Sequence, residues 1–284
     1  MGMKTSVSLF AVLAVAGLVA ACAKTAEPSA ADAAPTDKIK IEEKQAEPPM
    51  PDIDFAEFAA SVVANPARPE ADRADDERRK PAAALEFMQI TPSMSVFEVE
   101  AGGGWYTELL SHAVGPTGSV VMQNPEGFRA FVGEQIDARL AGNRLANVRQ
   151  SLSNFDALDA ADASIDLVTW VQGPHELYFK PSEGVTLGDP AKSYAEIYRI
   201  LKPGGAYVVI DHSAVAGAPE TTGHDLHRID RAIVVEMAEA AGFTLEAESD
   251  FLANPADTRT ITVFDPSIRG HTDQFTLRFR KPRG

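Results

Sequence analysis

Short runs of β-branched and other apolar residues alternate with helical patterns from residue 53 to residue 284. This alternation is typical of an α/β fold in which helices cover both faces of a mostly parallel, doubly wound sheet. The last runs follow one another without intervening helices, which favours antiparallel strands at the C-terminal end. The pattern predicts strands over 95–99, 119–122, 165–171, 207–210, 243–251, 260–264 and 274–280.

Helical periodicity separates these strands. The first predicted helix stops near Asn65 and Pro66, and Gly242 closes the last one as a left-handed cap. Length and pattern are compatible with one folded domain over residues 53–284. The predicted helices cover 55–64, 70–89, 105–112, 191–201 and 227–241.

The first 52 residues differ in composition from this domain. Lys4 is followed by an uncharged stretch, 7–21, which is shorter than the roughly 20 apolar residues that span a bilayer but suits the apolar part of a signal peptide. Residues 23–52 consist largely of Ala, Pro, Glu and Lys, with little to bury. This composition predicts a disordered, solvated linker.

The residues Leu18-Val19-Ala20-Ala21-Cys22 resemble the lipobox of bacterial lipoproteins. The resemblance implies a lipoprotein signal peptide over 1–21, cleavage before Cys22, and a linker over 22–52 that begins with the lipidated cysteine. Several acyl chains would make this membrane anchor durable. Because Ala23 stands where an aspartate commonly retains lipoproteins in the inner membrane, the resemblance implies a cell-envelope protein on the outer membrane, facing the periplasm. An ordinary secretory signal with an accidental cysteine is the alternative.

Lipidation of Cys22 is directly testable. Mass spectrometry of the mature protein is expected to find a chain that begins at an acylated Cys22. An uncut and unmodified amino terminus would contradict the prediction.

Charge and cysteine content narrow the range of functions. The chain carries 26 Lys and Arg against 41 Asp and Glu, a formal net charge of −15. This charge repels polyphosphates and releases no counterions from nucleic acid, so no nucleic-acid partner is expected. A single cysteine excludes an intrachain disulfide and a cysteine-rich zinc site.

Ligands of open α/β sheets bind beyond the carboxyl ends of the strands. Four polar clusters follow predicted strands and should therefore converge on one site: residues 98–104, Gln123 with Asn124, residues 172–176, and Asp211 with His212. In the first cluster, three consecutive glycines, Gly102 to Gly104, let the backbone approach a ligand closely. A dinucleotide fingerprint fits poorly, because no glycine follows at the required spacing.

Three motifs carry a resemblance to class I S-adenosylmethionine-dependent methyltransferases. They are Glu98-Val99-Glu100-Ala101-Gly102-Gly103-Gly104, Gln172-Gly173-Pro174-His175-Glu176 and Ile200-Leu201-Lys202-Pro203-Gly204-Gly205-Ala206-Tyr207. Further stretches after Gly104, from Asp211 to Ala214 and from His227 to Asp230 are similar to a bacterial group of predicted methyltransferases, many of them exported. The resemblance covers residue 64 to the end of the chain.

The resemblance implies a Rossmann-like sheet of seven strands that binds S-adenosylmethionine and methylates a small molecule. It places the methionine end of the cofactor over Glu98 to Gly104 and the ribose near Gln123 and Asn124. The remaining implied cofactor-binding residues are Phe155 and Asp156, near the adenine, and Gln172.

Two departures from the family pattern bear on this function. Glu100 stands where the motif usually has its first glycine, so its side chain must turn away, occupy the methionine site, or pair with the cofactor's ammonium group. The acidic residue that usually binds both ribose hydroxyls is absent, and Gln123 or Asn124 must replace it. The alternative function is a non-catalytic, periplasmic ligand-binding module on the same fold.

Methyl transfer needs positioning, and a base where the acceptor must lose a proton. We expect His175 to be the base, because imidazole titrates near neutrality, and Glu176 to orient it. Further histidines at 212, 224 and 227 have no recognised metal-ligand spacing, so no metal site is expected. Arg73 or Arg79 is a candidate partner for a ligand carboxylate, and Trp105 is expected to pack in the core.

Overall fold

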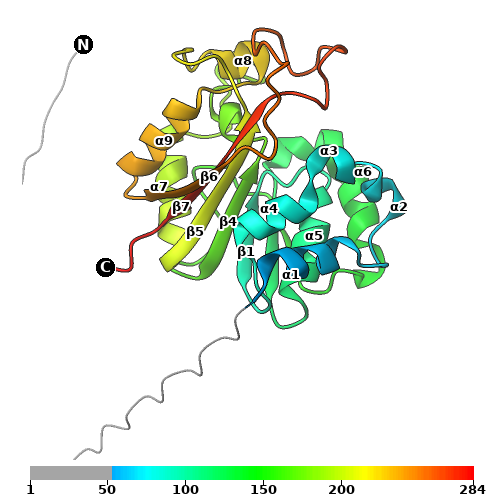
Figure 1. Ribbon diagram of the computed structural model, residues 1–284. Helices are drawn as coiled ribbons and strands as arrows, with labels where there is room; N and C mark the ends of the chain where they lie inside the picture. The colour runs from blue at the N-terminus through cyan, green and yellow to red at the C-terminus, as the bar shows by residue number, and fades with distance from the viewer. Residues whose placement is uncertain (1–52) are drawn as a thin grey trace, which may run out of the picture. The chain divides into compact units, whose positions relative to one another are not determined.

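The computed structural model describes residues 53–284, which form a seven-stranded sheet covered by helices (Figure 1). The predicted signal peptide over 1–21, the lipidation site Cys22 and the linker over 22–52 lie outside the described residues. Within 53–284, no helix has both the length and the apolar character needed to cross a membrane.

The sheet has the strand order β3-β2-β1-β4-β5-β7-β6. Strands β3, β2, β1, β4 and β5 run parallel, and β7 pairs antiparallel with both β5 and β6. The predicted mostly parallel α/β sheet with antiparallel C-terminal strands is confirmed. The strands are β1 Ser95–Val99, β2 Ser119–Gln123, β3 Val148–Ser151, β4 Ile165–Val171, β5 Leu201–His212, β6 Thr244–Ser249 and β7 Gln274–Arg280.

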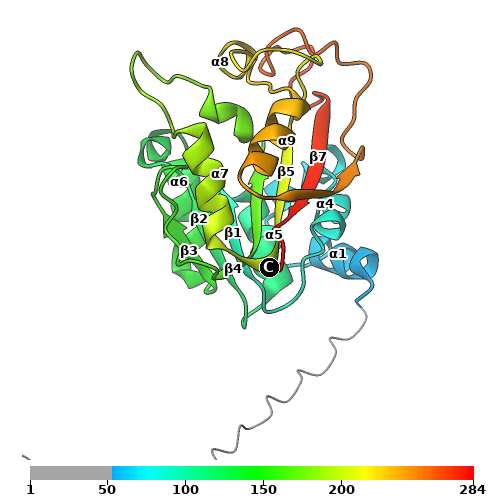
Figure 2. The same cartoon turned by 90° about the vertical axis from the view of Figure 1, so that its left-hand side faces the viewer.

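Helices cover both faces of the sheet, and Figure 2 shows α7 and α9 on one of them. Short 3₁₀ helices add η1 Glu126–Phe128, η2 Ala141–Asn143 and η3 Pro174–Leu177. The α-helices are α1 Phe55–Val63, α2 Glu70–Arg73, α3 Asp76–Arg79, α4 Pro81–Met88, α5 Trp105–Val114, α6 Arg129–Leu140, α7 Pro190–Ile200, α8 Thr222–Leu226 and α9 Arg231–Ala240.

Two hydrophobic cores lie on opposite faces of the sheet, because successive side chains of a strand point to opposite sides. In β1, Val96 packs in the core formed with α1, α4 and α5, whereas Phe97 packs in the core formed with α7 and α9. Both side chains are fully buried. The near-continuous apolar runs of the central strands follow from burial on both faces.

The predicted helix over 70–89 is wrong as one element, because the chain breaks it into α2, α3 and α4. Lys80 adopts a left-handed conformation (φ 46°), and Pro81 then begins α4 at a position where its missing N–H costs no helical hydrogen bond. The predicted helix over 227–241 begins only at Arg231, because the side chain of Asp230 caps it by accepting from Ala232 N (3.0 Å).

The predicted strand over 260–264 is also wrong. Its backbone groups bond elsewhere: Val263 N donates to Leu226 O (3.2 Å), and Ile261 O accepts from Arg228 Nε (2.9 Å). Arg228 also pairs with Asp257 while fully buried, and this pair attaches the β6–β7 loop to the segment after α8. Helix α6 and strand β3 were not predicted, since both bury few apolar side chains.

A buried ionic network connects α5, α6 and the segment before α3. Glu108 is fully buried and accepts hydrogen bonds from Arg139 (3.0 Å) and twice from Arg144 (2.6 Å each). Its other neighbour is His112, whose Nε2 lies 3.0 Å from Oε1. Burial raises the pKa of Glu108, but the hydrogen bonds from His112 and the arginines outweigh burial and lower the pKa to about 2.

Replacing Glu108 by Gln should lower the free energy of unfolding at pH 7 by about 3 kcal/mol, because Arg144 loses its carboxylate and Arg139 keeps only its pair with Asp72 (2.7 Å). The folded-state pKa is about 2 against 4.5 for an unperturbed glutamate. The wild-type stabilisation is therefore present above pH 4.5 and is lost as the pH falls towards 2.

Denaturant unfolding at several pH values measures this difference. Glu183→Gln, which changes an exposed glutamate, is the matched control and should leave stability unchanged. A cost for Glu108→Gln that stays constant down to pH 2.5 would contradict the account.

Candidate active site

A cleft of about 660 Å³ lies at the carboxyl ends of β1 and β4. The predicted site residues that line it are Glu98, Glu100, Gly102, Gly103, Gln172 and Glu176. The convergence of the β1 and β4 clusters follows from the parallel pairing of these strands, in which Val99 lies opposite Trp170. The clusters after β1 and β4 therefore meet at one cleft, whereas Gln123, Asn124, Asp211 and His212 do not line it.

The glycine loop between β1 and α5 has an open surface towards this cleft. Gly102 has φ 56°, in the left-handed region that favours glycine, and a Cβ built there would meet no other atom within 4 Å. Gly104 has φ 82° but does not line the cleft, and a Cβ there would lie 2.7 Å from both Met122 and Arg139 side-chain atoms. Gly102 thus leaves room for a ligand, whereas Gly104 allows close packing.

Gln123 and Asn124 hold the glycine loop in place and do not line the cleft. Gln123 Oε1 accepts from Glu100 N (2.8 Å), and its Nε2 donates to Ser153 O (2.6 Å). Asn124 Oδ1 accepts from Gly102 N (2.8 Å), and its Nδ2 donates to Gly102 O (3.1 Å). Both side chains are buried, so their hydrogen bonds satisfy the loop backbone where water does not reach.

Phe155 and Asp156 also lie outside the lining of the cleft. Phe155 is buried and packs against Trp170, with ring centroids 4.9 Å apart. Asp156 accepts a hydrogen bond from the backbone N–H of Asp189 (3.1 Å). The structure thus places the two residues against the loop that leads into α7.

Glu100 turns its carboxyl towards β4, and Oε2 accepts from Trp170 Nε1 (2.9 Å). The side chain therefore borders the cleft without covering Gly102. Burial raises the pKa of Glu100 well above its usual value, and the nearby charge of Glu176 raises it further. Glu100 itself has φ 54°, so the backbone keeps the left-handed conformation expected of the glycine that it replaces.

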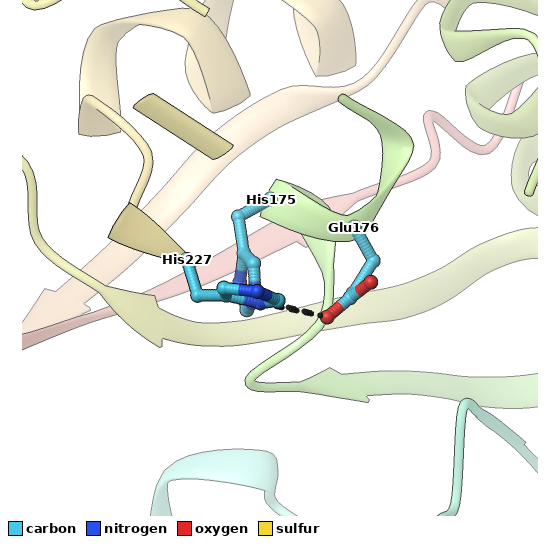
Figure 3. Close-up of side chains that lie close together, drawn as sticks. All are labelled: His175, Glu176 and His227. Carbon is cyan, nitrogen blue, oxygen red and sulfur yellow. Dashed lines mark hydrogen bonds and ion pairs between the residues drawn. The ribbon is translucent and has the colours of Figure 1, made fainter. Parts of the chain in front are cut away.

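His175 lies behind Glu176, outside the lining of the cleft and almost fully buried. Its Nδ1 is 2.7 Å from Asp211 Oδ1, and its Nε2 is 3.3 Å from Glu176 Oε1. Burial lowers the pKa of His175, but the charge and hydrogen bond of Asp211 and the contact with Glu176 outweigh burial and raise it to about 10. Glu176 and His227 are the members of this cluster that line the cleft. Figure 3 shows the side chains of His175, Glu176 and His227 next to one another.

The structure also adds residues to the site that the sequence patterns did not assign to it. Arg139 of α6 lines the cleft and donates through Nε to Gly103 O (2.7 Å). Of the two arginines predicted as candidates, Arg79 lines the cleft, whereas Arg73 donates to Asn65 O. Trp105, which was expected to pack in the core, also lines the cleft, and its ring centre lies 4.7 Å from the Arg79 guanidinium. The other aromatic and amide residues of the lining include Tyr106, Phe128, Phe131, Gln135, Phe179 and Phe264.

The strand order, with antiparallel β7 between β5 and β6, and a glycine loop after β1 define the class I methyltransferase fold. A SAM-dependent methyltransferase from Aquifex aeolicus matches 81% of this chain and 99% of its own, with a TM-score of 0.51 and 19% identity. A chain of the complex between the Haloferax volcanii Trm112 methyltransferase activator and a putative methyltransferase matches 80% of this chain and 97% of its own, with a TM-score of 0.54 and 18% identity. These likenesses show the fold.

Sequence comparison then shows the family. The profile of the ubiE/COQ5 methyltransferase family matches residues 78–229, which is more than half of the chain, and the chain belongs to this family. The sequence motifs predicted a methyltransferase that uses S-adenosylmethionine. Membership of this family confirms both the class of enzyme and the cofactor.

Two curated relatives are both named "Ubiquinone/menaquinone biosynthesis C-methyltransferase UbiE". The Hydrogenovibrio crunogenus protein is 30% identical over 195 residues, covering 69% of this chain and 66% of its own length. The Legionella pneumophila (strain Paris) protein is 27% identical over 194 residues, covering 68% and 67%. The chain thus spans about two thirds of the length of these relatives.

Glu98, at the floor of the cleft, provides a test of this geometry. Its buried carboxyl accepts from Thr107 Oγ1, and burial raises its pKa to about 8. The group is then neutral in the folded chain but ionised in the unfolded chain between pH 5 and pH 8, so it makes folding less favourable as the pH rises through this window.

Glu98→Gln mimics the neutral acid and removes this pH dependence. Relative to the wild type, the variant should gain about 3 kcal/mol of unfolding free energy between pH 5 and pH 8. Urea unfolding at pH 5, 6, 7 and 8 measures the change. A difference between the two proteins that does not vary with pH would show that the Glu98 carboxyl is not held neutral.

Proposed function

We propose that this chain is an S-adenosylmethionine-dependent methyltransferase that methylates a small, ring-bearing molecule. The observation that carries the proposal is the open backbone surface at Gly102, which faces a cleft of about 660 Å³ lined by Glu98 and Glu100. Family membership indicates the reaction, which is methyl transfer, and the cleft is the candidate site for this reaction.

The residues of the cleft fit the cofactor of the family. S-adenosylmethionine supplies an electrophilic methyl group on a sulfonium and carries an ammonium and a carboxylate at its methionine end. The carboxyls of Glu98 and Glu100 lie where a cationic group can approach the glycine loop, and the guanidinium of Arg79 is available to a carboxylate. Arg79 Nε is buried and makes no hydrogen bond among residues 53–284; its nearest carboxylate oxygen, Asp75 Oδ2, lies 3.5 Å away, so a ligand carboxylate can supply a closer partner.

An apolar, aromatic acceptor suits the mouth of the cleft. Phe131 is 82% exposed and Phe264 is 53% exposed, and both line the cleft. Exposed aromatic side chains at a cleft commonly mark a binding surface for apolar ligands. The relatives are named as C-methyltransferases of ubiquinone and menaquinone biosynthesis, and we extend to this chain only the class of a ring-bearing acceptor.

We assign the polar group of the acceptor to the surface formed by Glu176 and His227, which face the cleft side by side. His175 acts through Glu176, because its Nε2 contacts that carboxylate and Asp211 fixes its other nitrogen. His175 is therefore a positioning residue in this proposal, and Glu176 is the member of the predicted pair that can touch the acceptor.

We further propose that the chain acts at the cell envelope, on the outer membrane facing the periplasm, held by lipids on Cys22. The lipobox-like residues 18–22 and the signal-peptide composition of 1–21 support this location. The net charge of −15 supports a small-molecule substrate and no nucleic-acid partner.

Calorimetric titration of the full chain with S-adenosylmethionine and S-adenosylhomocysteine tests the proposal. Both ligands should bind the wild-type protein. Gly102→Leu should weaken binding by at least about tenfold, or ~1.4 kcal/mol, because the new side chain occupies the ligand's space.

Gly142→Leu is the matched control for this variant. Gly142 has φ 65°, and a Cβ there also meets no atom within 4 Å, but it does not line the cleft. Each variant should lose a similar amount of stability, on the order of 1 kcal/mol, from the left-handed backbone. No heat at millimolar ligand would contradict the proposal, and so would equal affinities of the two variants for the cofactor. Cofactor binding without methyl transfer to quinol-like acceptors would instead favour a ligand-binding module.

A further inference from the structure

Two imidazoles and one carboxylate converge beside the cleft, and Figure 3 shows them pointing towards one another. Glu176 Oε1 lies 3.3 Å from His175 Nε2 and 3.2 Å from His227 Nδ1. One ligand atom from each residue lies within 4.8 Å of the others, and this is the one such group found within residues 53–284. The cluster thus has the donor set of a two-histidine, one-carboxylate metal site.

The spacing of the donor atoms matches the edges of a metal coordination polyhedron. With metal–ligand bonds of about 2.0–2.2 Å, neighbouring ligand atoms in tetrahedral or octahedral geometry are roughly 3.0–3.5 Å apart. The two contacts of Glu176 Oε1, at 3.2 and 3.3 Å, fall within this range. The donor nitrogens of His175 and His227 lie within 4.8 Å of each other, so the two rings must at most move slightly closer together to bind one ion.

Asp211 gives His175 the orientation that a metal ligand needs. Its Oδ1 accepts from Nδ1 of His175 (2.7 Å), so Nε2, which points towards Glu176, is the nitrogen that can bind a metal ion after releasing its proton. The carboxylate is itself fixed, because it accepts from the backbone N–H groups of His175 (2.9 Å) and His212 (2.7 Å) and is fully buried. A carboxylate behind a histidine in this way is the usual support of a metal-bound imidazole.

The surroundings of the cluster favour a cation and leave it accessible. The fully buried carboxyl of Asp211 lies behind His175 and is a second acidic group beside the cluster. Glu176 and His227 line the cleft, so one side of the cluster faces the space assigned to the ligands. Phe179 and Phe264 pack against the His227 ring, with centroids 4.7 and 4.8 Å away, and hold it in place.

We propose that His175 Nε2, Glu176 Oε1 and His227 Nδ1 bind a divalent first-row transition metal ion, such as Zn²⁺, Fe²⁺ or Co²⁺. Mixed nitrogen and oxygen donors suit these ions better than Mg²⁺ or Ca²⁺, which prefer oxygen. The remaining coordination positions face the cleft, where an enolate or phenolate oxygen of the acceptor can bind. This last role rests on the proposed methyltransferase function, whereas metal binding itself does not.

Direct metal titration tests the site without an activity measurement. Full-length protein without a histidine tag is stripped with a chelator and titrated with Zn²⁺ by calorimetry and with Co²⁺ by visible absorption. The wild type should bind one equivalent at micromolar or tighter affinity. Glu176→Gln and His227→Gln should each weaken binding at least tenfold, with loss of the intense Co²⁺ absorption.

His224→Gln is the matched control, since His224 lies on α8 just before His227 but outside the cluster. It should bind Zn²⁺ and Co²⁺ like the wild type, and circular dichroism should show that all variants fold. Wild-type protein that takes up no ion at 100 µM Zn²⁺, or tight binding that survives in the Glu176→Gln/His227→Gln double variant, would overturn the proposal.

Titration of the same metal-free protein with S-adenosylmethionine separates the two proposals. Cofactor binding without metal uptake would overturn the metal site and leave the proposed function intact. Metal uptake with no cofactor binding would support the metal site while contradicting the methyltransferase function.

Discussion

Hydrogen bonds to the backbone of the glycine loop are the constraint on which the rest of the site depends. Gln123 and Asn124 at the end of β2 bond the loop from one side, and Arg139 of α6 bonds Gly103 from another. Three consecutive glycines have no side chains to pack, so these polar contacts replace packing in defining the loop's shape. The buried carboxylate of Glu108 in turn holds Arg139. Helices α5 and α6 and the end of β2 therefore support the glycine loop together.

Burial and ion pairing give the carboxyls of the cleft different charge states. Burial keeps the proton on Glu98, whereas the hydrogen bonds from His175 and His227 outweigh burial and lower the pKa of Glu176 to about 2. Burial also lowers the pKa of His212 to about 3, so this imidazole is neutral at pH 7. A single acidic pocket thus contains both neutral and ionised groups, which suits a cleft that receives a cationic cofactor and a polar acceptor.

Local patterns predicted the fold where each element buries a continuous apolar surface. The strands over 95–99, 165–171 and 274–280 were predicted with their observed bounds, because burial on one or both faces leaves a clear signature. The strand expected over 260–264 is wrong: Val263 is its one buried apolar residue, and the segment's backbone bonds to Arg228 and Leu226 instead of to a strand. Helix α6 was missed because it buries little beyond Ile136.

The sequence by itself determined the fold class, the glycine loop and the edge of the sheet where the candidate cleft lies, because these follow from local periodicity and from where strands end. Only the tertiary structure decided which polar residues meet. Glu176 and His227 are 51 residues apart and come together through η3 and the end of α8, while Arg139 reaches Gly103 across 36 residues. No local pattern encodes such pairs, since they depend on how separate elements pack. For the same reason, the sequence could not show that Gln123 and Asn124 support the glycine loop from behind the cleft.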